Sequence, residues 1–320
     1  MSRMWEPSYL KLYESGELDK RIDLLYRILE SCELCPRKCR ANRLEGEKGV
    51  CKSGKELMVS SYSPHFGEED PLVGTGGSGT IFLTNCNLLC VYCQNYEISH
   101  LEQGETKSES QVANYMLSLQ QRGCHNINFV TPTHFTPQLV KATKHAIEQG
   151  LRLPLVWNCG GYENIKTIEL LDGIVDIYMP DMKYGDSDPA KKYSNAPDYF
   201  PVVKEVVKAM HKQVGDLKLD ERGIAQRGLL IRHLVLPNNL AGSEKVLKFI
   251  AEEISKDGYV NVMSQFRPAG RALHYKELSR SPTSEEFDRA MAITERLGLA
   301  CGLDARQCCA RDKTRKQLGE

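Results

Sequence analysis

Short apolar and β-branched runs alternate with helical patterns from about residue 79 to Gly298. The runs expected to form strands are 80–84, 126–130, 153–158, 174–183, 229–237 and 259–266. Helices are expected over about 112–122, 136–149, 162–171, 200–214 and 243–255, and in a last segment that ends at Gly298. Gly123 and Gly150 close two of these patterns, as glycines commonly do at helix ends. A regular succession of strand and helix predicts a parallel sheet with right-handed crossovers.

The number of strand–helix units indicates an α/β protein built on a partial (β/α)6 barrel, an open relative of the TIM barrel. In such a barrel the chemistry lies at the C-terminal ends of the strands. A doubly wound parallel sheet is the alternative, because hydrophobic periodicity alone does not distinguish the two folds. The barrel is expected over residues 79–304, followed by a C-terminal tail at 305–320.

Residues 1–78 do not follow this alternation. A helix is expected around 19–30, before the cysteine-rich stretch CELCPRKCRANRLEGEKGVC, which indicates a small metal-held extension. The segment GTGGSG (74–79) lacks the Lys-Ser/Thr pair of a phosphate-binding loop, so we interpret it as flexible backbone. The polar segment 215–228 is expected to be a surface insertion.

Composition narrows the classes of partner and compartment. The 42 basic and 42 acidic residues cancel, so there is no strong signal for nucleic acid or for an anionic membrane surface. No apolar run is long enough to span a membrane, and the polar N-terminus does not resemble a signal peptide. A cytoplasmic location is therefore expected. In that reducing compartment the twelve cysteines would serve metals or catalysis rather than disulfides.

Three of these cysteines directly follow the first expected barrel strand. Cys86, Cys90 and Cys93 have the spacing C-x3-C-x2-C, and their thiolates could surround one face of a [4Fe–4S] cluster. A cluster ligated entirely by protein normally takes four cysteines, so three would leave one iron open to an external ligand. The alternatives are a zinc site completed by a distant His100 or His125, and a coincidental group of unliganded core cysteines.

With Tyr92 before its last cysteine, this motif resembles the signature of the radical S-adenosylmethionine (radical SAM) superfamily. The segments CELCPRKC, FVTPTH, MPDMKY, RHLVLPNN and QFRPAGRA further resemble a branch of pyruvate formate-lyase-activating-enzyme-like proteins. The resemblance implies that S-adenosylmethionine chelates the open iron and is cleaved reductively to a 5′-deoxyadenosyl radical, which abstracts hydrogen from a substrate. It also implies a one-electron reductant such as flavodoxin or ferredoxin. The implied substrate is a glycyl-radical enzyme or a small molecule.

Further cofactor-binding residues are expected at the other strand ends. Asp181 and Lys183 lie two residues apart at the end of the fourth strand, so both side chains should face the barrel mouth. An Asp-x-Lys at this place contacts the sulfonium cofactor in the activating enzymes that the chain resembles. An exposed ion pair is the alternative interpretation. Asn158 ends the third strand and is a candidate cofactor or substrate contact.

After the second strand, Thr131, Thr133 and His134 replace the Gly-Gly-Glu stretch of many superfamily members and are candidates for the same contacts. The alternative is a rigid loop formed by Pro132. Weaker candidates at later strand ends are Gln265, Arg267, His233 and His274. Cys159, Cys124 and Cys301 are interpreted as small buried residues, and adjacent Cys308 and Cys309 receive no assignment.

A second group of cysteines, Cys32, Cys35, Cys39 and Cys51, has the spacing C-x2-C-x3-C-x11-C. Four thiolates form a closed ligand set, which suits a structural zinc or a fully ligated auxiliary iron–sulfur cluster. Unliganded thiols are the alternative. The additional cysteines that follow the radical motif in some activating enzymes are absent from this chain, which weakens an electron-relay role.

The function expected from these observations is that of a radical SAM enzyme, with a glycyl-radical partner as a candidate substrate. The first alternative is radical modification of a small molecule or of a protein side chain. The second is a non-catalytic iron–sulfur electron carrier or a zinc-stapled scaffold. The sequence does not specify the substrate, because fold-level kinship does not transmit it.

Overall fold

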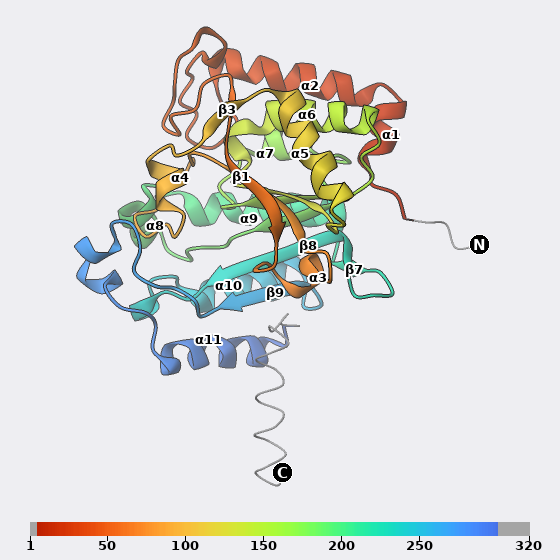
Figure 1. The fold of residues 1–320 in the computed structure, drawn as a ribbon. Coiled ribbons are helices and arrows are strands. Elements are labelled where there is room, and N and C mark those ends of the chain that lie inside the picture. The colour runs from red at the N-terminus through yellow and green to blue at the C-terminus, as the bar shows by residue number, and fades with distance from the viewer. Residues whose placement is uncertain (1–4, 300–320) are drawn as a thin grey trace.

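A curved sheet of mostly parallel strands forms the centre of the molecule (Figure 1). The computed structural model describes residues 5–299, so the expected tail and Cys301, Cys308 and Cys309 lie outside the described residues. The six parallel strands are β2 (Ser78–Leu83), β4 (Ile127–Val130), β5 (Leu155–Cys159), β6 (Ile177–Pro180), β8 (Ala225–Leu234) and β9 (Tyr259–Met263). From β4 onward, each of them pairs with the preceding strand of this set. This order confirms the partial barrel and excludes the doubly wound sheet, in which the strand order reverses.

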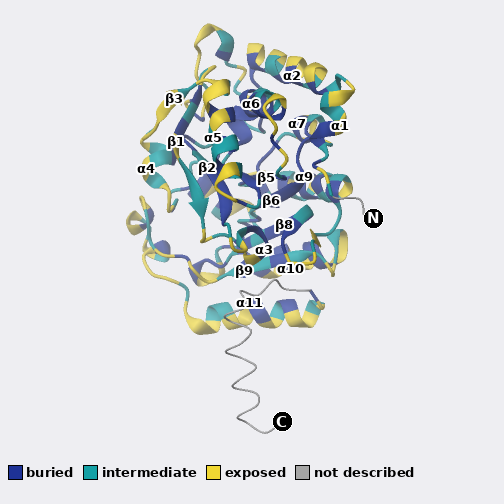
Figure 2. Cartoon of the chain, turned by 45° about the vertical axis from the view of Figure 1, so that its right-hand side comes forward, coloured by how far each residue is buried: buried dark blue, intermediate teal, exposed yellow. Residues whose placement is uncertain are grey.

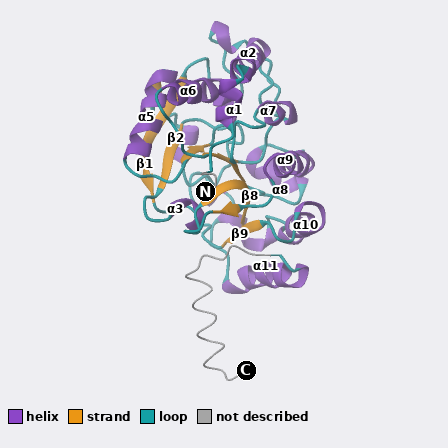
Figure 3. Ribbon diagram, turned by 90° about the vertical axis from the view of Figure 1, so that its right-hand side faces the viewer, coloured by secondary structure: helices purple, strands orange, loops and turns teal. Residues whose placement is uncertain are grey.

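Helices lie in an arc on the outer side of the strands (Figure 3). They are α5 (Glu109–Gln121), α6 (Thr136–Glu148), α7 (Ile165–Leu170), α8 (Ser187–Ser194), α9 (Tyr199–Val214), α10 (Ser243–Phe249), continued by a π-helical turn (Ile250–Ile254), and α11 (Ser284–Leu297). Helix α5 begins with a capping box, in which the Ser108 hydroxyl accepts from the Gln111 N–H and the Gln111 side chain accepts from the Ser108 N–H. Helix α8 lies between the strand expected at 174–183 and the helix expected at 200–214, where we expected no helix.

Strand alternation divides the buried residues into an outer and an inner core. On β5, Leu155 and Trp157 contribute to the large core beneath the helices, whereas Val156 belongs to a smaller cluster with Ile177, Met179, Ala225 and Leu230. Leu72 joins this inner cluster from the short helix α3 (Asp70–Val73). The central strands are therefore buried on both faces (Figure 2), as expected for parallel strands in an α/β fold.

Residues 5–78 extend the same sheet. Strand β1 (Leu57–His65) pairs antiparallel with β2, and β3 (Glu105–Lys107) pairs antiparallel with β1. Helices α1 (Tyr9–Glu14) and α2 (Glu17–Ile28) contact α6 and lie at the top of Figure 1. We expected a small metal-held extension in this region and did not expect β1. The remaining short helices are α4 (Tyr96–His100) and the 3-10 turns Leu29–Ser31, Arg43–Glu45, Thr133–Phe135, Pro237–Asn239, Ala272–His274 and Lys276–Leu278.

Two segments that we expected to be loops have a more specific structure. A Cβ on Gly76 would lie 1.9 Å from the Gly123 carbonyl oxygen, so the Gly-rich segment is closely packed rather than simply flexible. Strand β7 (Lys218–Leu219) pairs antiparallel with the start of β8, so the expected surface insertion forms a hairpin with the fifth barrel strand. Within residues 5–299, no helix is long and apolar enough to cross a membrane.

Candidate active site

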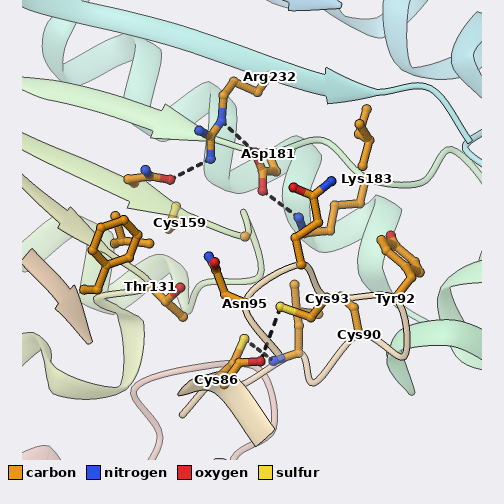
Figure 4. A pocket seen from close by; sticks show the side chains of 18 of the residues that line it. Cys86, Cys90, Tyr92, Cys93, Asn95, Thr131, Cys159, Asp181, Lys183 and Arg232 are labelled. Atoms are coloured by element: carbon orange, nitrogen blue, oxygen red, sulfur yellow. Dashed lines mark hydrogen bonds and ion pairs between the residues drawn. The ribbon is translucent and has the colours of Figure 1, made fainter. Parts of the chain in front are cut away.

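The loop after β2 carries Cys86, Cys90 and Cys93 to the C-terminal ends of the parallel strands, where a cavity of about 370 Å³ opens (Figure 4). Asn85 and Leu89 have positive φ angles of 70° and 51°, an uncommon conformation for residues with a Cβ. The loop is thus tightly turned around its cysteines. The cavity is also lined by His65, Glu68, Phe82, Leu88, Gln94, Ser99, His100, Val130, Gly160, Leu234, Met263 and Phe266.

Each of the three sulfurs accepts a hydrogen bond. The Leu88 N–H lies 3.3 Å from Cys86 Sγ, the Ser99 hydroxyl 3.3 Å from Cys93 Sγ, and the Ser194 hydroxyl 2.9 Å from Cys90 Sγ. Burial, and then the neighbouring Cys90 and Cys93, raise the pKa of the Cys86 thiol to about 12. A bound cation would reverse this tendency, because metal ligation deprotonates a thiol outright. The donor set and its hydrogen bonds therefore fit an iron–sulfur cluster.

The zinc alternative at this loop is not supported. In the part of the chain that the structure describes, no group of three or more His, Cys, Asp or Glu side chains is close enough to hold a single metal ion. The cysteines of a four-iron cluster bind separate irons and lie farther apart than the ligands of one ion. Of the two proposed histidine ligands, His100 lines the cavity, whereas His125 accepts a hydrogen bond from the Gly76 N–H and does not line it.

Asp181 and Lys183 form a charged network with Arg232, a residue that we did not single out from the sequence (Figure 4). Lys183 Nζ lies 2.5 Å from Asp181 Oδ2, and Arg232 Nε lies 2.8 Å from Asp181 Oδ1. Burial alone would raise the pKa of the Asp181 carboxyl, but Arg232 and Lys183 outweigh it and lower the pKa. Asp181 is thus a carboxylate at neutral pH. The exposed ion pair considered above is wrong, because 18% of the Asp181 side chain and 20% of the Lys183 side chain are exposed.

Arg232 also joins this network to neighbouring strand ends. Its Nη2 donates to Asn158 Oδ1 at 2.6 Å, and its Nη1 lies 3.4 Å from the Glu68 carboxylate. Burial raises the pKa of the Glu68 carboxyl to about 7, with Arg232 opposing the rise. Thr131 lies beside this network with φ of 61°, and its N–H donates to the Asn158 carbonyl. Asn158 and Thr131 both line the cavity.

Other candidates from the sequence lie elsewhere. The Thr133 hydroxyl donates to Glu163 Oε1 at 2.5 Å, and His134 Nε2 pairs with the Thr84 carbonyl at 2.8 Å. Both side chains are buried and neither lines the cavity, so the geometry does not support a cofactor contact for them. The reason is the 3-10 turn at Thr133–Phe135, which directs the chain away from the cavity after Thr131.

Near the later strand ends only Gln265 of the weaker candidates lines the cavity. His233 faces the helical layer, where its ring nitrogens pair with the Met182 carbonyl and the Ser243 hydroxyl. Its neighbour Arg232 faces inward, because successive side chains of a strand point to opposite faces. Arg267 and His274 do not line the cavity.

Tyr92 of the radical SAM motif and Cys159 are buried in the wall of the cavity. Tyr92 is 5% exposed and packs edge-on against Tyr184 and Phe266, so it supports the cavity through its ring. Cys159 also borders the cavity but is buried, and burial raises its thiol pKa well above the ordinary range. These properties agree with a packing role for Cys159.

The second cysteine group lies in the N-terminal segment. Cys32, Cys35 and Cys51 are buried and Cys39 is partly buried. Burial raises the pKa of the Cys35 thiol to about 12, and the neighbouring Cys51 and Cys32 add to the rise. These cysteines also do not gather closely enough to ligate one ion, so the geometry does not support the zinc expectation.

Comparisons with known proteins identify a family and two relatives of this chain. Residues 80–219 match the Radical SAM superfamily. The uncharacterized proteins MJ0674 and MJ0808 of Methanocaldococcus jannaschii are 31% and 24% identical to this chain. The alignment with MJ0674 covers 91% of this chain and 82% of that protein, and the alignment with MJ0808 covers 83% and 78%.

Solved structures align over a smaller part of the chain. The radical SAM methyltransferase from Sphaerobacter thermophilus is 13% identical with a TM-score of 0.46, covering 69% of this chain and 65% of that chain. Methylornithine synthase (PylB) is 12% identical with a TM-score of 0.45, covering 69% and 63%. This chain thus spans slightly less than two thirds of either structure.

The family match includes the Cys86, Cys90 and Cys93 loop and the first four parallel strands, and the MJ0674 alignment extends over nearly the whole chain. The protein belongs to the radical SAM superfamily of enzymes, which use a [4Fe–4S] cluster to cleave S-adenosylmethionine.

Proposed function

We propose that this enzyme abstracts hydrogen from a residue of a partner protein, with the glycine of a glycyl-radical enzyme as the first candidate. The observation that carries the proposal is the size of the cavity. Its volume of about 370 Å³ is near the lower end of the range that encloses one drug-sized ligand, about 300–1,000 Å³. The cluster held by the three cysteines and S-adenosylmethionine would together take most of this space. The substrate would then present a small group at the mouth, as a loop of a larger molecule can.

The cysteine loop and the charged network would divide the work of holding the cofactors. Cys86, Cys90 and Cys93 would ligate the cluster, which together with S-adenosylmethionine supplies a 5′-deoxyadenosyl radical when bound. Asp181 offers carboxylate oxygens to hydroxyl groups, and the Lys183 ammonium is suited to a carboxylate. Arg232 holds Asp181 in place from the neighbouring strand. This arrangement favours a ligand with a vicinal diol and a carboxylate, as the ribose and the methionine part of S-adenosylmethionine provide.

The remaining partners follow from the chemistry. Reductive cleavage needs one electron, and a flavodoxin or ferredoxin is the proposed donor. Thiols that must stay reduced and iron-bound suit the cytoplasm, which is the proposed location. The likeness to pyruvate formate-lyase-activating enzymes, from the motifs quoted above, is the further support for a glycyl-radical partner.

The first experiment tests the cofactor assignment. Protein reconstituted anaerobically with iron and sulfide is mixed with dithionite and S-adenosylmethionine, and 5′-deoxyadenosine is measured by chromatography. Wild-type protein should release it and Cys90→Ser should not. Cys124→Ser is the matched control, because Cys124 is a buried thiol that lies away from the cavity. Equal release by Cys90→Ser and wild type would refute the assignment.

The second experiment tests the substrate class. Purified pyruvate formate-lyase serves as the probe, and electron paramagnetic resonance detects a glycyl radical after incubation with the active enzyme. A radical on the probe supports the proposal. The opposite outcome is that a small-molecule fraction of a cell extract increases the release of 5′-deoxyadenosine and no protein radical forms. This result would overturn the protein-substrate assignment but not the assignment as a radical SAM enzyme.

A further inference from the structure

The cysteine-rich N-terminal loop is folded so that its four thiols share one region. Lys38, Arg40 and Lys52, each adjacent to a cysteine, have positive φ angles of 40°, 57° and 58°. The turns close with backbone hydrogen bonds from Lys38 N–H to the Cys35 carbonyl and from Lys52 N–H to the Gly49 carbonyl. A Cβ on Gly49 would lie 2.2 Å from Cys39 Sγ, so this sulfur rests against the turn that carries Cys51.

Arg43 supplies an independent observation beside these thiols. Its side chain is completely buried, and its guanidinium donates to the carbonyls of Gly54 and His134 at 2.6 Å and 2.7 Å. Nη1 also lies 3.9 Å from Cys32 Sγ. Among the ion pairs of residues 5–299, none involves Arg43. The guanidinium thus contacts carbonyl oxygens and lies 6.0 Å from the centre of the Phe135 ring, and a negative charge beside it would compensate the buried cation further.

Metal-bound thiolates would provide that compensation. Four cysteine thiolates around a [4Fe–4S] core carry a net negative charge, and Cys32 would place part of it beside the Arg43 guanidinium. A zinc ion does not fit the present spacing, because no three potential ligands in the described residues are close enough to share one ion. A cluster, whose cysteines bind separate irons, is compatible with more widely spaced sulfurs.

The same loop contacts the loop of the radical site. Arg37 Nε donates to the Asn87 carbonyl at 2.9 Å, and Asn85 Nδ2 donates to the Ser53 hydroxyl at 3.2 Å. Asn85 and Asn87 flank Cys86 on either side. The two cysteine loops are therefore joined directly, and a metal centre in one would hold the backbone of the other.

We propose that Cys32, Cys35, Cys39 and Cys51 bind a second iron–sulfur cluster, with Arg43 as its buried counter-ion. The site does not depend on the proposed substrate. Its occupancy can be measured without any turnover, so failure of the glycyl-radical assignment would not affect it.

The test separates the two sites by composition. Wild-type protein and a variant with Cys86, Cys90 and Cys93 changed to alanine are reconstituted anaerobically, and iron, sulfide and zinc are measured per chain. The variant should keep about four irons and four sulfides, and the wild type should hold about eight of each. Adding Cys35→Ser and Cys51→Ser to the variant should remove the remaining iron, whereas adding Cys124→Ser should not. A zinc ion, or no metal, in the folded variant would overturn the proposal. A wild-type content of only about four irons would also overturn it, and this measurement requires no substitution.

A second variant tests the role of Arg43. Arg43→Gln should lower the reduction potential of the second cluster, since a nearby positive charge favours the more negative, reduced form. The matched control is Arg40→Gln in the same loop, whose side chain is 74% exposed and screened by solvent. Redox titration followed by electron paramagnetic resonance measures both. If neither Arg43→Gln nor Arg40→Gln changes the reduction potential of the second cluster, the counter-ion assignment is wrong.

Discussion

Arg232 offers the sharpest test of the charged network in the cavity. Its guanidinium contacts Asp181 at 2.8 Å, Asn158 at 2.6 Å and Glu68 at 3.4 Å, so one side chain joins three elements that border the proposed S-adenosylmethionine site. The substitution Arg232→Gln keeps a polar side chain of similar length and removes the charge. Asp181 would retain only Lys183 as a cationic partner.

The expected magnitude follows from the burial of these groups. Removing one member of a buried ion pair costs about 3–5 kcal/mol of stability. The exposed fractions of 16% for Arg232 and 18% for Asp181 favour the lower end of that range. For ligand binding, one charge-assisted hydrogen bond lost or misplaced corresponds to about 1.5–3 kcal/mol. Since about 1.4 kcal/mol is tenfold in affinity, the dissociation constant for S-adenosylmethionine should rise roughly 10- to 100-fold.

Anaerobic calorimetric titration of S-adenosylmethionine into reconstituted protein measures this change, with iron content determined in parallel. The matched control is Arg227→Gln on the same strand, β8. Arg227 lies at the opposite end, 3.8 Å from Asp176, and does not line the cavity. The Arg227→Gln variant should lose stability and keep the wild-type affinity for S-adenosylmethionine. If Arg232→Gln carries a full complement of iron and binds S-adenosylmethionine as tightly as wild type, the proposed role of the network is wrong.

Three further changes test the packing, the electrostatics and the hydrogen bonds of the fold. Gly160→Ala should cost about 1–3 kcal/mol and reduce iron loading, because its Cβ would lie 2.6 Å from the Leu88 side chain within the cysteine loop; iron content and urea unfolding measure both. Burial, partly opposed by backbone N–H groups, raises the pKa of Asp176 from 3.8 to about 6, so its contribution to stability is fully present below pH 3.8 and is lost as the pH rises through 6. The free energy of unfolding of Asp176→Asn, measured relative to wild type by urea unfolding, should therefore rise by about 3 kcal/mol between pH 4 and pH 8. A difference between variant and wild type that stays constant with pH would contradict this. Ser194→Ala removes the hydroxyl that donates to Cys90 Sγ and should lower the reduction potential of the radical-site cluster in a redox titration, whereas an unchanged potential would contradict the stated role of that hydrogen bond.

The six barrel strands were predictable because each is a short apolar run between helical patterns. The parallel order follows from that alternation, since consecutive units pack beside each other with right-handed crossovers. Helix α8 was missed because its sequence, SDPAKKYS, is mostly polar. Its buried residues, including Tyr193 and Ser194, reflect tertiary contacts that local periodicity does not reveal.

At the site, sequence reasoning succeeded where a motif and the strand parity agreed. Asp181 and Lys183 face one cavity as their spacing predicts. Arg232 was missed, although its position between Leu230 and Leu234 on β8 was a usable signal, because the inward face of that strand depends on its register with β6. His233 was chosen for its place near the strand end, yet the same parity directs its side chain into the helical layer.

The Cys86 motif also decides between the classes of function considered from the sequence. A non-catalytic carrier or scaffold would explain the cysteines alone, but it would not explain the match of residues 80–219 to the radical SAM superfamily. The roles of the other cavity residues in binding S-adenosylmethionine remain predictions, and the binding and turnover experiments above test them.

The least predictable feature is how the open side of the barrel is filled. Leu72 of α3 joins the inner core with residues of β5, β6 and β8, although α3 follows β1 at the other edge of the sheet. In the same segment, the Glu68 carboxylate faces Arg232 on β8, and Glu69 accepts a hydrogen bond from Asn261 on β9 at 3.0 Å. The segment after β1 thus spans the gap between the first and last strands and contacts both. A seventh and an eighth strand–helix unit would occupy this position in a closed barrel. Here an N-terminal segment takes their place, and it brings a carboxylate with a raised pKa to the wall of the cavity.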